Sequence, residues 1–261
     1  MIKLDGQIIE QNHFPDGSLF IRNERAGRYI SGYHYIEWYY ENDAELFTLI
    51  CLRKSLGDEG VELILPYIPH ARMDRVKNEE DIFTLKYFCE VINSLNFKEV
   101  QVLDPHSDVA PALLDRIYVH PIKIIIEDAI EDIDNPDLMF YFPDAGAAKR
   151  YSSMVKAPYT YGNKIRDWET GKIQGLSIAD PDLVKGKDIL IIDDICSRGG
   201  TFYYSAKALK EAGANKIYLY VTHCENTILE GEVLTSGLIE KVYTTNSIFT
   251  KEHEKVEVYE L

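Results

Sequence analysis

Residues 187–222, KDILIIDDICSRGGTFYYSAKALKEAGANKIYLYVT, contain the pattern that decides the fold. Residues 188–192 form a short β-branched apolar run, which is typical of a strand covered on both faces in a parallel sheet. Asp193 and Asp194 stand where this strand is expected to end, and residues 197–201, SRGGT, form a glycine-rich turn. Apolar residues then recur at helical spacing, and a second apolar run follows. The stretch therefore predicts a strand, a turn, a helix and a further buried strand.

This turn and the acidic pair indicate a site for a phosphorylated sugar. A glycine turn that leads into a helix presents unpaired N–H groups and the positive end of the helix dipole, which together bind anions. Two adjacent carboxylates repel each other, so a site that keeps both charged gains from a cation or from several hydroxyl donors. The alternative is an ordinary turn in which Asp and Gly serve as cap and breaker. The candidate residues are Asp193, Asp194, Ser197, Arg198, Gly199, Gly200 and Thr201.

The composition indicates a soluble globular protein of two domains. Of the 261 residues, 46% are apolar and 27% charged, and this length favours two domains, which we place at residues 1–120 and 121–261. No apolar run approaches the roughly 20 residues of a membrane span, and the N-terminus lacks a signal-peptide pattern. Four scattered cysteines predict a reducing cytoplasm and no structural zinc. The net charge of −15 argues against nucleic-acid binding but leaves anionic small molecules as ligands, because local cations can reverse the field in a cleft.

Strands and helices alternate along the chain, which predicts βαβ units and parallel sheets. The expected strands are residues 18–23, 29–40, 61–65, 100–103, 138–142, 241–244 and 256–259, and the expected helices are residues 42–56, 79–95, 122–133 and 227–235. The polar residues 160–175 are expected to be irregular and mobile. We therefore predict an α/β fold of two similar domains, each a mainly parallel sheet flanked by helices, with ligands at the carboxyl ends of the strands.

Two further groups of polar residues follow predicted strands of the first half. Arg72 and Arg75 lie in a loop with His70, and guanidinium groups bind phosphate oxygens bidentately. The alternative for this loop is a solvated surface or a salt bridge between subunits. Asp104 and His106 offer an oxygen and a nitrogen, a mixture that Mg²⁺ tolerates when phosphates supply the other ligands. A strand-end histidine with a purely structural role is the alternative.

The second half contains two comparable groups. Asp144 precedes Gly146 and a predicted helix, which gives an anion site with an acid beside it or, alternatively, a plain turn between strand and helix. Lys164 and Arg166 lie in the segment expected to be mobile. A flexible loop with two cations can close over a reacting phosphate and neutralise developing charge, although loop charges are often only solvated.

Taken together, these motifs resemble the ribose-phosphate diphosphokinase (phosphoribosyl-pyrophosphate synthetase) family from about residue 14 to residue 249. The acidic pair and residues 197–201 resemble the family's binding motif for ribose and its 5-phosphate, which phosphoribosyltransferases share. Lys164 and Arg166 resemble the catalytic residues, and His106 and Asp144 are the implied metal ligands. The residues implied to bind ATP are Phe14, Asp16, Arg72, Asp74, Arg75 and His106.

The resemblance implies two phosphoribosyltransferase-like domains and a transfer reaction that requires Mg²⁺. The β,γ-diphosphoryl group of ATP would pass to the 1-hydroxyl of ribose 5-phosphate, giving phosphoribosyl pyrophosphate and AMP. The turn at Phe14 resembles a hairpin that reaches a neighbouring subunit, so a homo-oligomer is expected. A phosphoribosyltransferase would leave the Arg72–Arg75 and Asp104–His106 motifs unexplained, and a catalytically silent relative is a further alternative.

The sequence also departs from the family pattern. Arg198 stands where the family commonly has a small hydroxyl residue, and a guanidinium suits more phosphate oxygens than a terminal monophosphate offers. The alternative acceptor is therefore ADP-ribose, as in family-like enzymes of phage NAD salvage, whereas the plain alternative has Arg198 point to solvent. Met73 and Ser18 replace residues that the family uses near adenine. Both ends of the sequence are shorter than in the family. We therefore do not carry over the family's usual assembly or its regulation by phosphate and ADP.

Overall fold

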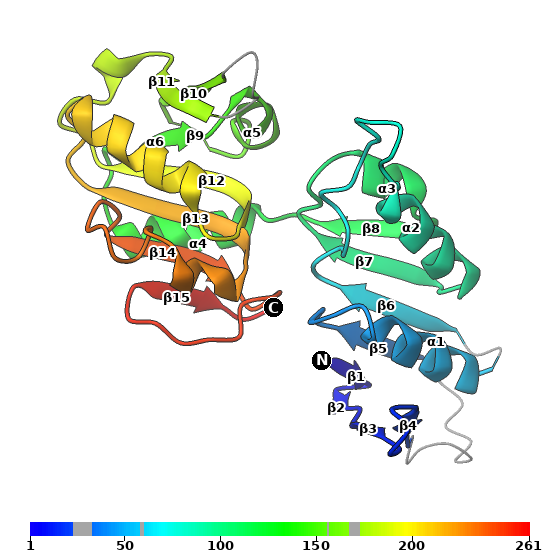
Figure 1. Cartoon of the computed structure of the whole chain (residues 1–261). Helices are drawn as coiled ribbons and strands as arrows, with labels where there is room; N and C mark the ends of the chain where they lie inside the picture. Colours follow the sequence, from blue (N-terminus) through cyan, green and yellow to red (C-terminus); the bar gives the residue numbers. More distant parts are fainter. Residues whose placement is uncertain (23–32, 58–59, 156, 167–172) are drawn as a thin grey trace. The chain divides into compact units, whose positions relative to one another are not determined.

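The computed structural model describes the chain except for residues 23–32, 58–59, 156 and 167–172 (Figure 1). The side chains of residues 164–166 and 173–176 also lie outside the description. The described chain divides into two compact units, Met1–Pro121 and Ile122–Leu261.

The first unit is built on a six-stranded sheet in the order β2-β1-β5-β6-β7-β8 among the described residues. Strands β5 to β8 are parallel, whereas β1 pairs antiparallel with both β2 and β5. A separate hairpin joins β3 and β4. The bounds are β1 Ile2–Leu4, β2 Gln7–Ile8, β3 Gln11–His13, β4 Leu19–Ile21, β5 His34–Trp38, α1 Glu45–Ser55, β6 Val61–Leu65, α2 Thr84–Ser94, β7 Glu99–Leu103, α3 Val109–Leu113 and β8 Ile117–His120.

The second unit is built on a seven-stranded sheet in the order β11-β10-β9-β12-β13-β14-β15. All neighbouring pairs are parallel except β10 with β11. Helix α6 lies in front of this sheet and α4 behind it in the view of Figure 1. The bounds are α4 Lys123–Ile133, β9 Met139–Phe142, α5 Ala145–Tyr151, β10 Tyr159–Arg166, β11 Ile173–Ile178, β12 Ile189–Cys196, α6 Gly200–Glu211, β13 Ile217–Cys224, β14 Lys241–Thr245 and β15 Val256–Tyr259, with 3-10 turns at Pro181–Leu183 and Asn226–Glu230.

The predicted α/β class is confirmed, with parallel-dominated sheets flanked by helices in both units. Each unit has its own apolar core. The β6 and β7 strands contribute fully buried side chains such as Leu63 to the first core, and β12 and β13 contribute Ile191 and Leu219 to the second. Continuous apolar runs form these central strands because helices cover both faces of such a sheet. Among the described residues, no helix combines the length and the apolar character needed to cross a membrane.

Two expected helices differ from the structure. The helix expected at residues 79–95 begins only at Thr84, because the Asp81 carboxylate accepts hydrogen bonds from the N–H groups of Lys77 and Asn78 and so closes a turn there. The helix expected at residues 227–235 is reduced to a 3-10 turn that ends where Gly231 turns extended. The β8 strand and the β1–β2 pair were not expected, because each is only two to four residues long.

The segment expected to be irregular, residues 160–175, contains parts of two strands. Residues 159–161 pair parallel with β9, and β10 then continues past the end of β9 with β11 as its antiparallel partner. Its polar composition is compatible with strands because β10 and β11 pair with each other at one edge of the seven-stranded sheet. Residues 167–172 of this segment, and residues 23–32 of the expected strands 18–23 and 29–40, lie outside the described part of the chain.

Core truncation in the second unit should destabilise the protein strongly. Leu219 is fully buried in β13, so Leu219→Ala should lower the free energy of unfolding by about 2–5 kcal/mol through lost burial and a residual cavity. Leu183 is 49% exposed, and Leu183→Ala should change it by less than about 0.5 kcal/mol. Urea denaturation followed by circular dichroism measures both. Equal stabilities for the two variants would contradict the assigned core.

Candidate active site

The acidic pair lies inside strand β12 rather than after its end. Asp193 is in register with Val221 of β13, and pairing continues through Ile195 opposite His223. The Asp194 side chain is 3% exposed and that of Asp193 18% exposed, so both carboxylates are largely removed from water at the carboxyl end of the sheet. Burial and the neighbouring Asp194 raise the pKa of Asp193 well above its usual range, whereas Arg150 acts in the opposite direction.

Arg150 is a cation of this site that the sequence motifs did not identify. Its Nη2 atom lies 2.9 Å from Asp194 Oδ1 and 3.4 Å from Asp193 Oδ1. The guanidinium also lies over the ring of Tyr151, 5.0 Å from its centroid. Arg150 belongs to α5, which follows β9, the neighbour of β12 in the sheet. The only signal in the sequence is a basic residue in the helix after Asp144. That signal does not show that Asp193 and Asp194 are the partners of Arg150.

The glycine turn at residues 197–201, which we call the phosphate loop after its predicted role, is fixed by close contacts at two glycines. Gly199 has φ +76°, and a Cβ there would lie 2.2 Å from Val233 Cγ2. A Cβ on Gly231 would lie 1.9 Å from the Arg198 carbonyl oxygen. Glycine is required at both positions, at Gly199 also because L side chains rarely adopt a positive φ. Helix α6 begins at Gly200, so the loop leads into a helix N-terminus as expected.

The Arg198 side chain points away from the protein interior. It is 73% exposed and forms an ion pair with Glu230 at 2.8 Å, and Glu230 is itself 59% exposed. Of the loop side chains, Ser197 and Thr201 are partly buried. Neither alternative for Arg198 is met in full. Its guanidinium faces solvent, but the carboxylate of Glu230 holds it.

Asp144 serves as the N-cap of α5. Its Oδ1 atom accepts hydrogen bonds from the N–H groups of Gly146 and Ala147, both at 3.0 Å. The cap fixes the start of α5 and, with it, the position of Arg150 near the end of the same helix.

Lys164 and Arg166 lie in β10, opposite Leu176 and Ile173, and their side chains are outside the described part.

Thr222 and His223 lie at the carboxyl end of β13, next to the acidic pair of β12. His223 Nδ1 lies 2.8 Å from the Ser247 hydroxyl, and the Thr245 hydroxyl donates to the Thr222 carbonyl at 2.7 Å. Both residues are buried. Their polar groups are engaged in fastening the loop after β14 to β13, which makes this strand end a rigid neighbour of the site.

In the first unit, the loop of residues 66–75 carries the predicted ATP-binding residues. Arg75 makes a two-point contact with Asp74, with its Nε and Nη2 atoms at 2.6 and 2.8 Å from the carboxylate oxygens. The hydrogen bonds from Arg75 lower the pKa of Asp74 to about 2 against the raising effect of burial, and Ser107 and His106 act in the same direction. Arg72 is exposed.

This loop and the loop after β7 are joined. Ser107 donates a hydrogen bond to Asp74, and the Leu103 N–H donates to the Pro66 carbonyl at 3.0 Å. His106 therefore lies in the same neighbourhood as Asp74. The carboxyl ends of β6 and β7 thus bring two of the predicted motifs together, as expected for neighbouring parallel strands.

The predicted hairpin residues Phe14 and Asp16 form the turn between β3 and β4. The Phe14 ring is 53% exposed and packs on Phe20 with centroids 5.3 Å apart. The Asp16 carboxylate accepts from the N–H and hydroxyl of Ser18 at 2.9 and 2.6 Å. These hydrogen bonds lower the pKa of Asp16 and assign it a role in the turn. Ser18, where the family commonly has an acid, therefore serves as the partner of Asp16.

The structure groups the predicted residues by unit. The hairpin, the 66–75 loop and His106 belong to the first unit, and Asp144, the acidic pair and the phosphate loop belong to the second. Among the described residues, no cluster of three or more His, Cys, Asp or Glu is arranged to hold a metal ion. Mg²⁺ commonly takes only one or two protein carboxylates together with substrate phosphates, so such a cluster is not required.

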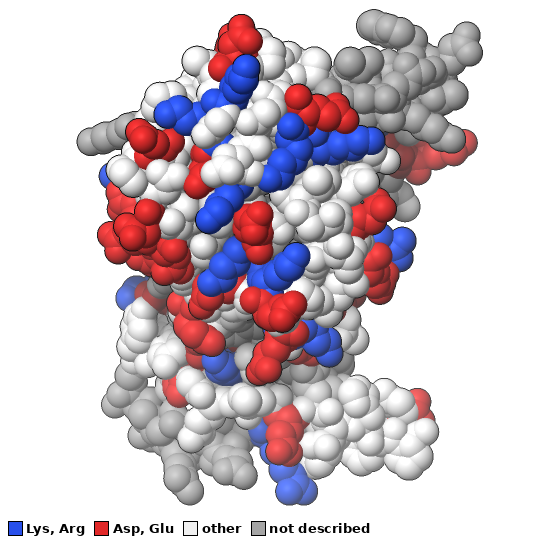
Figure 2. Space-filling model, turned by 90° about the vertical axis from the view of Figure 1, so that its left-hand side faces the viewer, with Lys and Arg blue, Asp and Glu red and all other residues white. Residues whose placement is uncertain are grey.

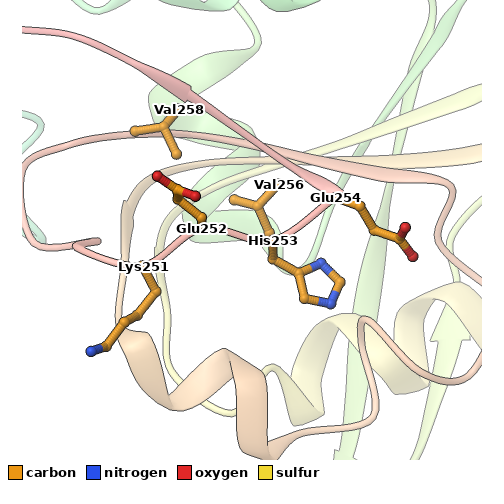
Figure 3. Close-up of a pocket in the computed structure, with 6 residues that line it drawn as sticks. All are labelled: Lys251, Glu252, His253, Glu254, Val256 and Val258. Atoms are coloured by element: carbon orange, nitrogen blue, oxygen red, sulfur yellow. The ribbon is translucent and has the colours of Figure 1, made fainter.

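A hollow of about 510 Å³ lies beside β15 (Figure 3) and is separate from these residues. Figure 3 shows that the charged side chains around it, Lys251, Glu252 and Glu254, point in different directions rather than toward one point. The ring of His253 accepts a hydrogen bond from the Lys255 N–H at 3.1 Å.

Figure 2 shows acidic and basic side chains interspersed on the face that it presents, without one large basic patch.

Comparisons with known proteins agree with this geometry. Residues 145–249, which include α5, the acidic pair and the phosphate loop, match the phosphoribosyl transferase domain family. The match lies entirely within the second unit. A ribose-phosphate pyrophosphokinase of Sulfurisphaera tokodaii is 27% identical over 92% of this chain and 84% of its own. One of Thermococcus kodakarensis is 28% identical over 93% of this chain and 86% of its own.

The solved structures extend the match to the fold of the chain. The crystal structure of phosphoribosylpyrophosphate synthetase from Mycobacterium smegmatis has a TM-score of 0.78 and covers 97% of this chain and 86% of its own, at 19% identity. These findings confirm the resemblance to the ribose-phosphate diphosphokinase family that the sequence motifs predict.

The contacts of the phosphate loop predict opposite results for two adjacent glycines. Gly199→Ala should lower the melting temperature by several degrees, because the added Cβ meets Val233 and the positive φ is strained. Gly200→Ala should leave it unchanged or raise it, since nothing lies within 4 Å of its added Cβ and alanine favours a helix start. Differential scanning calorimetry compares them. An equal loss in both variants would contradict the described loop.

The Asp74 contacts predict a pH-dependent contribution to stability. Its folded pKa of about 2 lies below the ordinary aspartate value of 3.8, so the stabilisation is present above about pH 4 and is lost as the pH falls toward 2. Asp74→Asn should therefore lower the free energy of unfolding at pH 7 by about 1–2 kcal/mol and flatten its decrease in acid. Asp108→Asn, at an exposed carboxylate, is the control. Urea titrations from pH 2.5 to 7 measure this, and an unchanged slope in Asp74→Asn would refute it.

Proposed function

We propose that this protein transfers the β,γ-diphosphoryl group of ATP to the 1-hydroxyl of ribose 5-phosphate, with Mg²⁺ as cofactor. The products are phosphoribosyl pyrophosphate and AMP. The observation that carries the proposal is the extent of the likeness to ribose-phosphate pyrophosphokinases, which spans 92–93% of the chain and so includes the first unit. The phosphoribosyl transferase domain match alone, at residues 145–249, leaves the 66–75 loop and His106 without a function.

The second unit supplies the acceptor site in this proposal. The N–H groups of residues 197–201 and the N-terminus of α6 bind the 5-phosphate, because they combine backbone donors with the positive end of a helix dipole. Asp193 and Asp194 accept hydrogen bonds from the sugar hydroxyls. The glycine contacts at Gly199 and Gly231 support this assignment, since they hold the loop backbone in one conformation before the ligand arrives.

The first unit supplies the ATP site. Arg72 and Arg75 bind the phosphate oxygens, with Asp74 holding Arg75 in place through its two-point contact. The Phe14–Asp16 hairpin packs on adenine in a neighbouring copy of the chain, and the 53% exposed Phe14 ring supports this role. The protein would therefore act as a dimer or a higher homo-oligomer.

His106 in the first unit and Asp144 in the second are each proposed as a ligand of Mg²⁺, which neutralises phosphate charge when bound. A histidine nitrogen or a carboxylate oxygen, completed by phosphate oxygens, fits this ion. The cap on α5 engages Oδ1 of Asp144. A structural role in the cap and a role beside the metal are compatible for one carboxylate with two oxygens.

The chemical step needs orientation and charge stabilisation rather than a covalent intermediate. The 1-oxygen of the sugar attacks the β-phosphorus, the bond from that phosphorus to the bridging oxygen of AMP breaks, and the hydroxyl proton leaves to solvent. Lys164 and Arg166 neutralise the charge that develops on the transferred group and on AMP. Their places in β10, on the strand that continues past β9, support a position near the sheet end that carries Asp144.

ADP-ribose is a second candidate acceptor, favoured by the position of Arg198. Its guanidinium lies at the outer side of the phosphate loop and pairs with the exposed Glu230. Exposed ion pairs contribute only about 0–1 kcal/mol, so a second phosphate can displace Glu230. Arg198→Thr should then weaken the use of ADP-ribose selectively, whereas equal effects on both acceptors would count against this candidate.

The deciding experiment incubates the protein with Mg-ATP and either acceptor, and analyses the products by mass spectrometry. The proposal expects AMP together with ribose 5-phosphate that is heavier by one diphosphate group. A heavier ADP-ribose instead would identify the second candidate. Failure to form AMP with either acceptor would indicate a catalytically silent relative and would refute the proposal.

Lys164→Ala should separate binding from turnover. Loss of one charge that stabilises the transition state should reduce kcat by about 10²–10³-fold, while the Kd for ATP measured by calorimetry changes little. Lys149→Ala, an exposed lysine on α5, should retain both values and serves as the control. Unchanged turnover in Lys164→Ala would remove this residue from the mechanism.

A further inference from the structure

Two neighbouring carboxylates in the second unit are largely buried, and burial of like charges needs a compensating cation. The side chains of Asp193 and Asp194 are 18% and 3% exposed. The Asp194 N–H donates to Asp193 Oδ1 at 3.0 Å, so this hydrogen bond offsets part of the charge. Arg150 contacts both carboxylates, with Nη2 at 3.4 Å from Asp193 Oδ1 and 2.9 Å from Asp194 Oδ1. Removal of one partner from a buried ion pair is strongly destabilising for the other.

The position of Arg150 is itself well defined by the fold. It lies on α5, whose first turn is fixed by the Asp144 cap. Its guanidinium lies over the Tyr151 ring at 5.0 Å, and Tyr151 is buried. The Arg150 side chain is 29% exposed, so it approaches the acidic pair with limited freedom. A planar guanidinium that touches one oxygen of each carboxylate also restricts the rotation of both.

We propose that Arg150 is a positioning residue of the acceptor site, which holds Asp193 and Asp194 in place for the vicinal hydroxyls of a pentose phosphate. This inference rests on the proposed function for the identity of the ligand. Arg150 contacts the Oδ1 atoms of both carboxylates. Arg150 thereby increases affinity for the sugar and takes no part in the phosphoryl transfer.

The charges around the pair support the same role. Burial raises the pKa of Asp193 first of all, Asp194 raises it further, and Arg150 from α5 opposes both effects. The hydrogen bond with Cys224 and burial chiefly raise the pKa of the Cys196 thiol on the same strand, and Asp193 contributes to this effect. Without Arg150, the pair retains a proton to higher pH. A protonated carboxyl has less acceptor capacity for sugar hydroxyls, so binding would weaken most in acid.

The test compares Arg150→Met, which removes the charge, with Arg150→Lys, which keeps it, and with Lys149→Met as the control on the same helix. Arg150→Met should raise the KM for ribose 5-phosphate at least 10-fold, with kcat and the KM for ATP changed less than 3-fold. Arg150→Lys should recover part of the loss. In Arg150→Met the acid limb of kcat/KM should move to higher pH. If the ion pair is purely structural, Arg150→Met should instead lower kcat and kcat/KM for both substrates together. The pH profile of kcat/KM should then stay in place.

A second measurement separates this inference from the proposed function. Carboxyl ¹³C NMR of the ligand-free protein follows the titration of Asp193 and Asp194 in the wild type and in both Arg150 variants. The midpoint should rise by at least one pH unit in Arg150→Met and by less in Arg150→Lys. If ribose 5-phosphate neither binds nor reacts with the wild type, the proposed function fails, while a shifted midpoint still supports the contact of Arg150 with the pair. An unshifted midpoint, or an unchanged KM in an active Arg150→Met protein, overturns the inference.

Discussion

The burial of β12 between β9 and β13 is the constraint on which the second unit depends. Residues 189–192 are fully buried, so polar side chains on this strand can occur only toward its carboxyl end. Asp193 and Asp194 stand there, and the chain must then reverse into α6 through the 197–201 loop. Because β9 and β13 end at the same side of the sheet, Asp144 and His223 are brought to this edge as well.

In the first unit, polar residues also gather where neighbouring parallel strands end, and a backbone hydrogen bond joins the two loops. Neighbouring strands β6 and β7 end side by side, and the backbone hydrogen bond from Leu103 to Pro66 joins the loops that follow them. Asp74 then receives Arg75 from its own loop and Ser107 from the other. A buried carboxylate with such partners is satisfied only when both loops are in place, so it orders Arg75, which we assign to ATP. In each unit, buried carboxylates therefore hold an arginine: Asp74 holds Arg75 in the first, and the acidic pair holds Arg150 in the second.

Much of the fold was predictable because its central strands are locally distinctive. The strands at residues 61–65 and 256–259 agree with the structure at both ends, and the helix at residues 122–133 within one residue. The prediction was wrong where a distant contact decides the backbone. The helix expected at residues 227–235 fails because Gly231 must pass next to the Arg198 carbonyl. The irregular segment expected at residues 160–175 contains strands because β9 and β11 offer pairing partners that no local pattern reveals.

The sequence by itself determined the α/β class, the acidic pair, the phosphate loop and the family resemblance, because strand burial and glycine turns leave their record in consecutive residues. Only the tertiary structure decided which groups meet. Arg150 contacts Asp194 across 44 positions of the chain, and Arg198 meets Glu230 across 32. Asp144 caps α5, and Ser18 satisfies Asp16. Contacts between strand ends depend on the order of strands in the sheet, which the spacing of residues along one chain does not encode.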